Sequence, residues 1–285
     1  VESTEASTYF ETAVEAKHGR ASFSAFEYSR VFSLRFEEVG RVAGKCACDV
    51  FKARLLKERV TAIVLHPLVL SGLLSFTLWP SFYADNVQKG RSVLSGKVGK
   101  KVFSTNLTVV DDGLLKNGWR THAFDGEGSS PCKKFLMRKG MVRTFLYDSY
   151  TAWKDGVEST GNAIRNNFRD LPAIGTTNVV MKGGKESWKD MLEEGTLYVR
   201  SVLGAFLSNP ITCDFSVKLA LGYYVSKGKL LPVKGNMISG NMLQVLKEVE
   251  LSKETMLAGS PGDALTYGLP SQVLPFMRTT QATIS

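Results

Sequence analysis

Residues 60–84 contain no charged side chain, and this stretch limits the folds open to the chain more than any other feature. An uncharged run of this length must either cross a bilayer or be buried inside a folded domain. Pro67 and Pro80 interrupt the run, which disfavours a membrane-spanning helix. We therefore expect a buried strand over residues 61–65, a turn at Pro67 and a buried helix up to Trp79, with no membrane association.

The spacing of apolar residues changes early in the chain. In residues 20–36, side chains at alternate positions form two sets, as on the two faces of a strand, and aromatic side chains are frequent. This pattern predicts a β-strand. Apolar residues then recur at steps of three and four over residues 39–55, which predicts one buried face of an α-helix. Lys52, Arg54 and Lys57 lie in the expected last turn of that helix, where its dipole favours basic side chains.

Residues 97–154 have the pattern of β-hairpins. Residues 102–110 predict a strand that ends at the turn sequence Asp111-Asp112-Gly113. Two pairs of short apolar strands also each flank a Lys-Gly turn. These are residues 135–137 with 142–146 around Lys139-Gly140, and residues 223–225 with 230–233 around Lys227-Gly228.

Two short helices are expected in the second half of the chain. One covers residues 187–194, with Ser187 and Asp190 as a capping pair, and the other covers residues 241–249, with Ser239 as a cap. Many strands with a few separated helices predict an α+β fold with strand-rich mixed or antiparallel sheets. Hydrophobic residues make up 44% of the chain and charged residues 22%, which is ordinary for a globular protein with a sizeable core.

The net charge of +9 allows an anionic partner, but the sequence does not concentrate the basic residues. The densest group is Lys97, Lys100 and Lys101, and no arginine-rich tract or repeated aromatic–basic motif accompanies it. We therefore expect a solvated basic surface and not a nucleic-acid-binding one.

The four cysteines predict a reducing compartment. Cys46, Cys48, Cys132 and Cys213 form no CxxC pair, and Cys46 and Cys48 should point to different faces of one helix. The chain begins at Val1 without a basic segment followed by an apolar one, so we expect no signal peptide and a cytoplasmic location.

Three histidines occur, and they cannot form the HExxH pair of a zinc peptidase. The three are His18, His66 and His122, and His66 is expected to be a strand-end residue and not a ligand. His122 lies close to Asp125 and Glu127, which makes a metal site conceivable, although turn chemistry explains these residues better.

Three other groups are candidate reactive sites. Asp111, Asp112, Asp125 and Glu127 form the best carboxylate set, since close carboxylates can share a proton or hold a cation, but all four also occur in turn sequences. Cys213 would need a neighbouring base to act as a nucleophile. The sequence Thr160-Gly161-Asn162-Ala163 is only weakly similar to a phosphate-binding loop.

A series of short motifs resembles the TldD/PmbA family. The sequence Asn209-Pro210-Ile211-Thr212-Cys213-Asp214-Phe215-Ser216 is similar to the family's NPVTGDFS-type signature, with Cys213 at its usual glycine. Other motifs follow the family's order from residue 36 to the C-terminus. These are Gly90-Arg91-Ser92, Val109-Val110-Asp111-Asp112, Phe124-Asp125-Gly126-Glu127-Gly128, Ser159-Thr160-Gly161-Asn162-Ala163, Thr177-Asn178, Gly228, Pro232-Val233 and Ile238-Ser239-Gly240-Asn241-Met242.

The resemblance implies one of two kinds of member. TldD-type chains are zinc metallopeptidases with an HExxxH helix, whereas PmbA/TldE-type chains, once described as modulators of DNA gyrase, lack that motif and serve as partner subunits. The equivalent helix here is residues 73–80. Ser75 stands for the first histidine, Phe76 for the glutamate and Pro80 for the second histidine. None of these residues is a useful zinc ligand or general base.

The sequence thus predicts a PmbA/TldE-like subunit that is not catalytic by itself. We expect residues 1–57 to be the remainder of an N-terminal or central α+β region and residues 58–285 to be the C-terminal domain. The resemblance implies a dimer with a TldD-like zinc chain or with a second copy, and proteolysis of peptides or unfolded segments. No residue is assigned to catalysis, a cofactor or a metal. Alternatives are an active hydrolase that uses Cys213 or the Asp125 and Glu127 carboxylates, and a DNA- or gyrase-associated binding protein.

Overall fold

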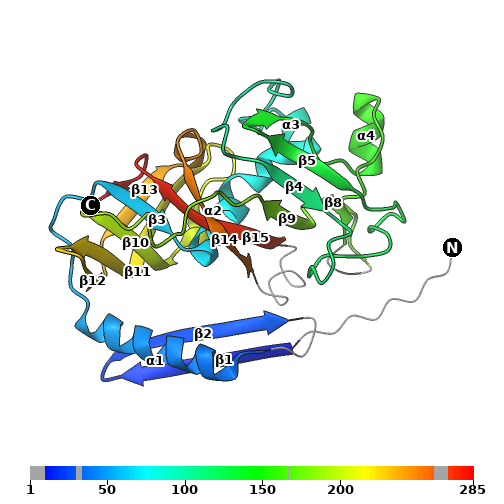
Figure 1. Cartoon of the computed structure of the whole chain (residues 1–285). Coiled ribbons are helices and arrows are strands. Elements are labelled where there is room, and N and C mark those ends of the chain that lie inside the picture. The colour runs from blue at the N-terminus through cyan, green and yellow to red at the C-terminus, as the bar shows by residue number, and fades with distance from the viewer. Residues whose placement is uncertain (1–9, 30–33, 166, 168, 260–268) are drawn as a thin grey trace.

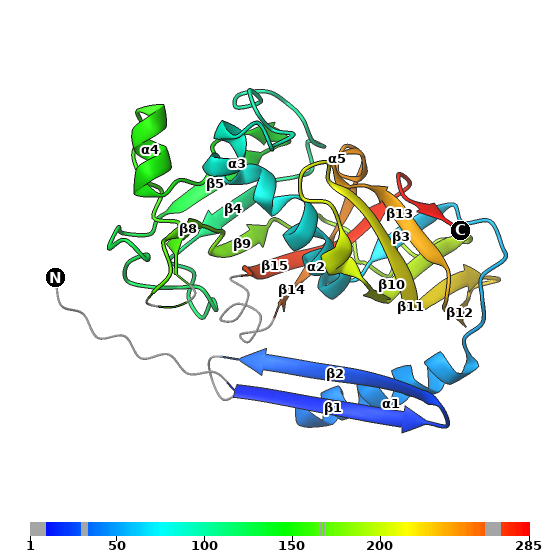
Figure 2. The same ribbon diagram turned by 180° about the vertical axis from the view of Figure 1, so that it is seen from behind.

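The computed structural model describes residues 10–29, 34–165, 167, 169–259 and 269–285. Most of them belong to a twelve-stranded mixed sheet that few helices cover. A two-stranded hairpin and one long helix form a second layer, which lies below the large sheet in Figure 1 and Figure 2. The predicted α+β class with strand-rich mixed sheets is confirmed.

The second layer consists of β1 (Phe10–His18), β2 (Ala21–Ser29) and α1 (Phe36–Lys52). The apolar face of α1, with Val39 and Ala43, packs against the hairpin. The strand predicted over residues 20–36 corresponds to β2, and its residues 30–33 lie outside the described part of the chain.

The helix predicted up to residue 55 ends earlier, at Lys52. Arg54 instead forms an isolated bridge with Val233, and the Lys234 amide donates to the Arg54 carbonyl at 2.9 Å. Lys52 lies in the last turn of α1, as predicted. Arg54 and Lys57 instead lie along a connection to the large sheet, because a sheet edge offers this backbone its hydrogen-bond partners. Cys46 is buried and Cys48 is exposed, as their two-residue spacing on α1 predicts.

The uncharged stretch forms the centre of the large sheet and the helix on it. β3 (Ala62–Leu65) lies between β10 (Thr196–Leu203), which runs parallel to it, and β15 (Ser271–Thr279), which runs antiparallel. Around this centre the strand order is β16-β13-β11-β10-β3-β15-β9-β4-β5-β6, with β12 on β11 and β14 on β15. The other strands are β4 (Val109–Asp112), β5 (Lys133–Arg138), β6 (Met141–Val142), β9 (Asn178–Met181), β11 (Asp214–Ser226), β12 (Lys229–Val233), β13 (Met237–Asn241), β14 (Glu250–Ala258) and β16 (Thr283–Ile284).

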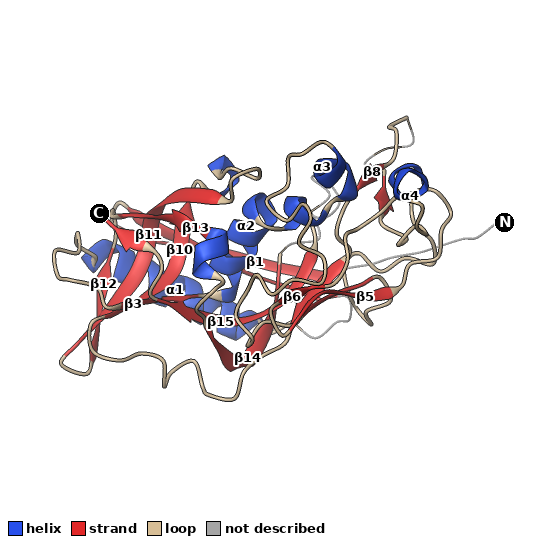
Figure 3. Cartoon of the chain, turned by 90° about the horizontal axis from the view of Figure 1, so that it is seen from above, coloured by secondary structure: helices blue, strands red, loops and turns tan. Residues whose placement is uncertain are grey.

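The helix α2 (Pro67–Thr77) packs against β15 and β10, and Figure 3 shows it lying across the sheet. Its side chains are buried on most sides, which explains why the sequence there is uncharged. Pro67 is the first residue of α2 and not a separate turn. None of the described helices is both long and apolar enough to cross a membrane.

The remaining elements are short. They are η1 (Trp79–Phe82), α3 (Ala84–Gln88), α4 (Ser149–Asp155), η2 (Ala205–Leu207) and α5 (Met242–Val245), with the separate pair β7 (Ala163–Ile164) and β8 (Ala173–Ile174).

Both Lys-Gly turns are confirmed, although the strand predicted over residues 142–146 shrinks to β6 at Met141–Val142. β5 pairs with β6 and β11 pairs with β12, each antiparallel. Lys139 and Lys227 have φ values of 50° and 51°, and the glycine after each lysine is also left-handed. Left-handed geometry at both central residues matches the twist of a two-residue hairpin, which is why glycine follows the lysine in each case.

Three further predicted elements are wrong in extent or kind. The strand expected over residues 102–110 begins only at Val109, because the Val102 and Phe103 amides both donate to the Gly140 carbonyl. It then continues through Asp111 and Asp112, which were predicted to be in a turn.

The two predicted helices in the second half fail for a similar reason. Residues 187–194 form turns, since Ser187 Oγ and the Trp188 amide donate to Glu254 of β14 and not to a capping partner nearby. The helix over residues 241–249 shrinks to α5, and its N-cap is Asn241, whose side-chain oxygen accepts from the Leu243 amide.

The left-handed backbone of Lys227 predicts a stabilising substitution. Lys227→Asn should raise the free energy of unfolding by roughly 0.5 kcal/mol, because asparagine tolerates this geometry better than lysine. Lys229→Asn is the control, since Lys229 lies in β12, where asparagine is disfavoured. Urea unfolding would measure both, and equal effects of the two substitutions would contradict the turn argument.

Candidate functional site

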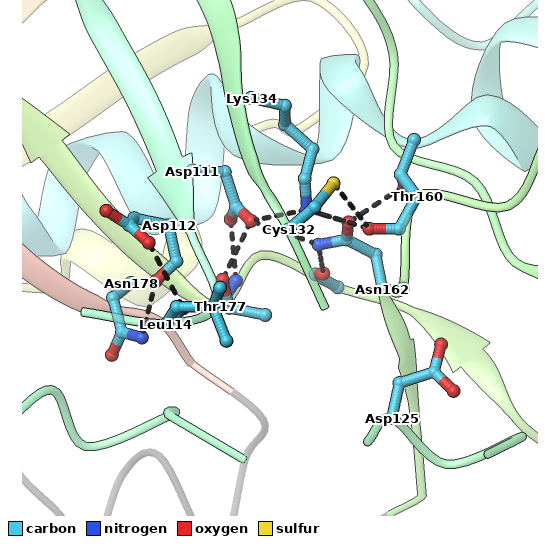
Figure 4. Close-up of polar contacts among 12 residues, drawn as sticks. Asp111, Asp112, Leu114, Asp125, Cys132, Lys134, Thr160, Asn162, Thr177 and Asn178 are labelled. Carbon is cyan, nitrogen blue, oxygen red and sulfur yellow. Dashed lines mark hydrogen bonds and ion pairs between the residues drawn. The ribbon is translucent and has the colours of Figure 1, made fainter. Parts of the chain in front are cut away.

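A buried carboxylate, Asp111, organises the part of the molecule around β4, β5 and β9. Its side chain is fully buried. Asp111 Oδ2 accepts from the Thr177 amide at 2.7 Å, and Oδ1 accepts from the Thr177 hydroxyl at 2.7 Å. Lys134 Nζ and Asn162 Nδ2 also donate to Oδ1, each at 3.2 Å (Figure 4). A buried charge is stable only when paired and hydrogen-bonded in this way.

Lys134 closes the network from the opposite side. Its ammonium group donates to Asp111, to the Thr160 carbonyl at 2.9 Å and to Asn162 Oδ1 at 2.6 Å, which are three acceptors for three N–H groups. Asn162 in turn donates to the Gly175 carbonyl at 2.9 Å. The network therefore joins strands and loops that are distant in sequence.

Two of the other three carboxylates of the predicted set, Asp125 and Asp112, accept hydrogen bonds from nearby turn amides. Asp125 accepts from the Glu127 and Ser129 amides, each at 2.9 Å, and its second oxygen accepts from the Ala163 amide at 3.0 Å. Asp112 accepts from the Leu114 amide at 3.1 Å. The predicted turn role is thus confirmed for Asp125 and Asp112 and wrong for Asp111. Glu127 instead accepts from the Ser149 amide at 2.8 Å, at the start of α4. Within the described ranges, no three His, Cys, Asp or Glu side chains lie close enough to hold a metal ion.

A cavity of about 310 Å³ opens above this network. Asn162, Thr177 and Asp125 are among the residues that line it, and Figure 4 shows Asp125 apart from the Asp111 network. The rest of the wall is formed by Trp119, Arg120, His122, Phe124, Gly126, Pro131, Gly161, Ala163, Ile164, Arg165 and Gly175. Local sequence patterns identified Asp125 and His122 but missed Lys134 and Arg120. One signal for Lys134 existed, because it alternates with Leu136 on the buried face of β5.

Cys213 is buried and has none of the features of a nucleophile. Its sulfur lies 3.6 Å from Ser81 Oγ and 3.5 Å from the Thr77 carbonyl. Burial raises the pKa of this thiol, so the protonated form predominates at neutral pH. Its φ of 64° is left-handed, which explains why glycine suits this position of the signature.

His66 ends β3, as predicted, and also caps α2. Its Nδ1 accepts from the Leu68 amide at 3.1 Å, and its ring lies edge-on to Phe276. His66 also lines a larger cleft of about 640 Å³, between residues 23–28 of β2 and residues 255–257 of β14. Trp119 lines both this cleft and the smaller cavity, so the two spaces adjoin.

Basic residues that are separate in sequence lie on neighbouring backbone segments at the sheet edge. The Gly99 amide donates to the Val142 carbonyl, and Lys101 forms a bridge with Met141. The segment with Lys97, Lys100 and Lys101 therefore borders the β5–β6 hairpin, which carries Arg138, Lys139 and Arg143.

Comparison with known proteins decides the family. Residues 58–285 match the family model described as PmbA/TldA metallopeptidase C-terminal domain. The chain belongs to the PmbA/TldD family. It is 37% identical over 249 residues to an uncharacterised protein of Methanocaldococcus jannaschii, which covers 87% of this chain and 58% of that protein. A metalloprotease of Methanothermobacter thermautotrophicus is 30% identical over 217 residues, 75% of this chain and 47% of that protein.

Solved structures give the same assignment. TldE from Thermococcus kodakarensis has a TM-score of 0.85 and 26% identity, over 97% of this chain and 62% of that one. A proposed modulator of a DNA gyrase from Thermotoga maritima has a TM-score of 0.83 and 25% identity over the same shares. The chain thus spans about half to three fifths of the length of these relatives.

Four motifs that carry the resemblance to the PmbA/TldD family meet at the small cavity. They are the segments around Asp111, Asp125, Asn162 and Thr177, and each contributes either to the wall or to the buried network beneath it. The cavity is therefore the place where family-typical residues distant in sequence come together.

Residues 73–80, which the resemblance places at the HExxxH helix of TldD-type chains, form the end of α2 and the start of η1 in this PmbA/TldD member. Ser75 Oγ accepts from Gln272 Nε2 at 2.9 Å, and Ser71 Oγ accepts from the same nitrogen at 2.6 Å. Trp79 Nε1 donates to Gln272 Oε1 at 2.9 Å. Phe76 is half-buried, and Pro80 opens the turn of η1. These side chains fix the helix to β15.

Removing the lysine of the buried pair should unfold the domain more easily. Lys134→Met leaves the Asp111 carboxylate buried without its countercharge, which costs about 3–5 kcal/mol. Lys133→Met is the matched control, because Lys133 is 64% exposed and lies 3.5 Å from Asp112. It should cost less than about 1 kcal/mol. Chemical unfolding of both variants measures the difference, and similar losses would contradict the assigned role of Lys134.

The buried histidine predicts acid sensitivity. Burial, with the nearby Arg200 charge, lowers the pKa of His66 well below 6.5. The unfolded state therefore takes up a proton below about pH 6.5 that the folded state does not, so stability is complete above this pH and falls below it. His66→Asn keeps a capping acceptor and should reduce the pH slope of the unfolding free energy by up to about 1.4 kcal/mol per pH unit.

Urea unfolding between pH 5.5 and 7.5 measures this slope. His18→Asn is the control, since His18 lies exposed on the hairpin, against the Phe51 ring. A slope that the His66 variant leaves unchanged would show that other groups cause the acid sensitivity.

Proposed function

We propose that this chain is a PmbA/TldE-type subunit that carries no zinc of its own and completes a metallopeptidase assembly. In this assembly a TldD-type chain holds the metal, and the present chain helps to form the space in which peptide is bound. The partner is a TldD-like chain or a second copy of this one. The proposed location is the cytoplasm.

The observation that carries the proposal is the environment of Ser75. This residue stands where the resemblance places the first zinc-binding histidine, and its hydroxyl accepts a hydrogen bond from Gln272. Serine and proline are poor zinc ligands, and phenylalanine cannot act as a general base. The helix therefore has a packing role, and its polar groups already have protein partners.

The larger cleft supports peptide binding. Residues 23–28 of β2 and residues 255–257 of β14 line it from opposite sides. In the described chain, β2 pairs only with β1, and these residues of β14 pair only with β15. Strand edges of this kind can accept an extended peptide through main-chain hydrogen bonds.

The structure disfavours the alternative of a hydrolase that acts alone. The Cys213 thiol is buried with a raised pKa, and both oxygens of Asp125 accept hydrogen bonds from the backbone. Neither group can readily reach a substrate in its reactive form. The nucleic-acid alternative stays a prediction, to which the basic segments at the β5–β6 edge are relevant.

Zinc content tests the proposed role. The chain purified alone and incubated with zinc should hold far less than one tightly bound zinc after dialysis, because α2 provides no ligand set. Mixed with a TldD-type chain from the same organism, it should form a complex with one zinc per pair. Elemental analysis and light scattering after size exclusion measure both quantities. One zinc per chain in the isolated protein would overturn the proposal, and the TldD-type chain alone is the control.

A further inference from the structure

Arg200 is a cation in the wall of the larger cleft, and no carboxylate of the described chain pairs with it. The residue is half-buried on β10, and its guanidinium carbon lies 5.4 Å from the centre of the Phe23 ring of β2. No hydrogen bond or ion pair joins its N–H groups to another described residue. A guanidinium that lies over an aromatic ring uses its face, so the donors along its edge remain free for a ligand.

The carboxylates of this cleft already have arginine partners. Apart from Arg200, its charged lining residues are Glu27, Arg35 and Glu38. Glu27 accepts from the amide and from Nε of Arg35, both at 2.8 Å. Glu38 accepts from Nε of Arg41 at 2.9 Å and from its terminal nitrogen at 2.6 Å. Arg200 is therefore the charged side chain of the described lining that has no countercharge.

The ionisable neighbours of Arg200 do not supply a negative charge either. Burial raises the pKa of the Cys46 thiol and of the Tyr198 hydroxyl, although the charge of Arg200 opposes the shift in both cases. Both groups are therefore protonated at neutral pH. A half-buried guanidinium among neutral groups favours a ligand that brings a carboxylate.

His66 offers a second donor beside Arg200. It is 7% exposed and lines the same cleft, and the Arg200 charge contributes to its lowered pKa, which places the two side chains near each other. Its Nδ1 accepts from the Leu68 amide, so the neutral ring carries its proton on Nε2. No described residue accepts from this N–H. One carboxylate can therefore accept from both side chains.

The strand edges of the cleft determine how an anion reaches Arg200. Residues 23–28 of β2 and 255–257 of β14 line the cleft, and an extended peptide that pairs with either edge directs alternate side chains to each side. Arg200 belongs to β10, which is neither of these edges, so it meets a side chain of such a peptide and not its backbone. Most other lining side chains are apolar, among them Val39, Val42, Leu68, Val69, Val202 and Leu257.

We propose that the larger cleft binds an extended peptide with an acidic side chain between apolar residues, and that this carboxylate lies on Arg200 and on Nε2 of His66. The inference names the class of peptide for the proposed peptide-binding function and rests on that function. An inorganic anion is a poorer match, because it has nothing to place on the apolar part of the wall or on the strand edges.

Titration calorimetry with matched peptides tests the acidic preference. Acetyl-Val-Thr-Glu-Thr-Val-amide should bind at least about tenfold more tightly than the same peptide with glutamine, because hydrogen bonds to a charged group are worth more than those to a neutral one. The glutamine peptide with a free C-terminal carboxylate separates the two sources of charge. It should bind like its amide, and binding as tight as that of the glutamate peptide would overturn the side-chain assignment.

Two arginines in similar contacts locate the carboxylate. Arg200→Gln should reduce the preference for glutamate over glutamine to less than about twofold, since the charged donor is lost. Arg138→Gln is the control, because Arg138 also lies over a phenylalanine ring, that of Phe135 at 5.2 Å, but outside the cleft. It should leave the preference unchanged. Both peptides are titrated into one sample of each variant, so a loss of folded protein affects them alike.

The outcomes separate this inference from the functions on which it depends. Equal binding of the glutamate and glutamine peptides would overturn the acidic preference and leave the cleft as a peptide site. No binding of any peptide at about 1 mM would overturn both the preference and the peptide-binding role. Equal effects of the two arginine substitutions would overturn the assignment to Arg200. The zinc content decides the subunit role independently of all three results.

Discussion

The paired charges of Asp111 and Lys134 hold together the half of the molecule that contains the small cavity. The carboxylate lies at the end of β4 and the ammonium on β5, and both reach Asn162, which lies in a different part of the chain. Thr177, just before β9, supplies two further donors. Neither charge could remain buried if one of these segments moved away, because each would lose partners that water cannot replace in the interior.

Patterns with a short period could be predicted from the sequence. The uncharged stretch became β3 and α2, and both Lys-Gly turns became left-handed hairpin turns. In each case the decisive interactions occur between residues close in the chain, so that spacing and turn chemistry contain the information. The motifs also identified the family correctly, because their order along the chain is itself a sequence property.

Interactions between distant residues could not be predicted in this way. The partners of Asp111 lie 23, 51 and 66 residues away, and nothing beside Asp111 in the sequence indicates them. The same Asp-Asp-Gly sequence serves a turn at Asp112 and a buried network at Asp111. Ser187 fails as a helix cap for a related reason, since its partner Glu254 belongs to β14. Local sequence propensity fails to predict the structure wherever a tertiary contact satisfies a polar group better than residues nearby in the chain can.

The polar cluster of α2 and the small cavity are joined through backbone pairing. Gln272, which binds Ser71 and Ser75 of α2, lies opposite Val179 in the parallel pair of β15 and β9, and the Ser271 amide donates to the Thr177 carbonyl at 3.2 Å. Thr177 belongs to the Asp111 network, so the two polar clusters occupy adjacent strands. Each cluster satisfies its own side chains, and strand register positions one relative to the other. A change in the side chains of α2 is therefore compatible with an intact cavity, because the backbone pairing of β9 with β15 does not depend on which residues α2 carries.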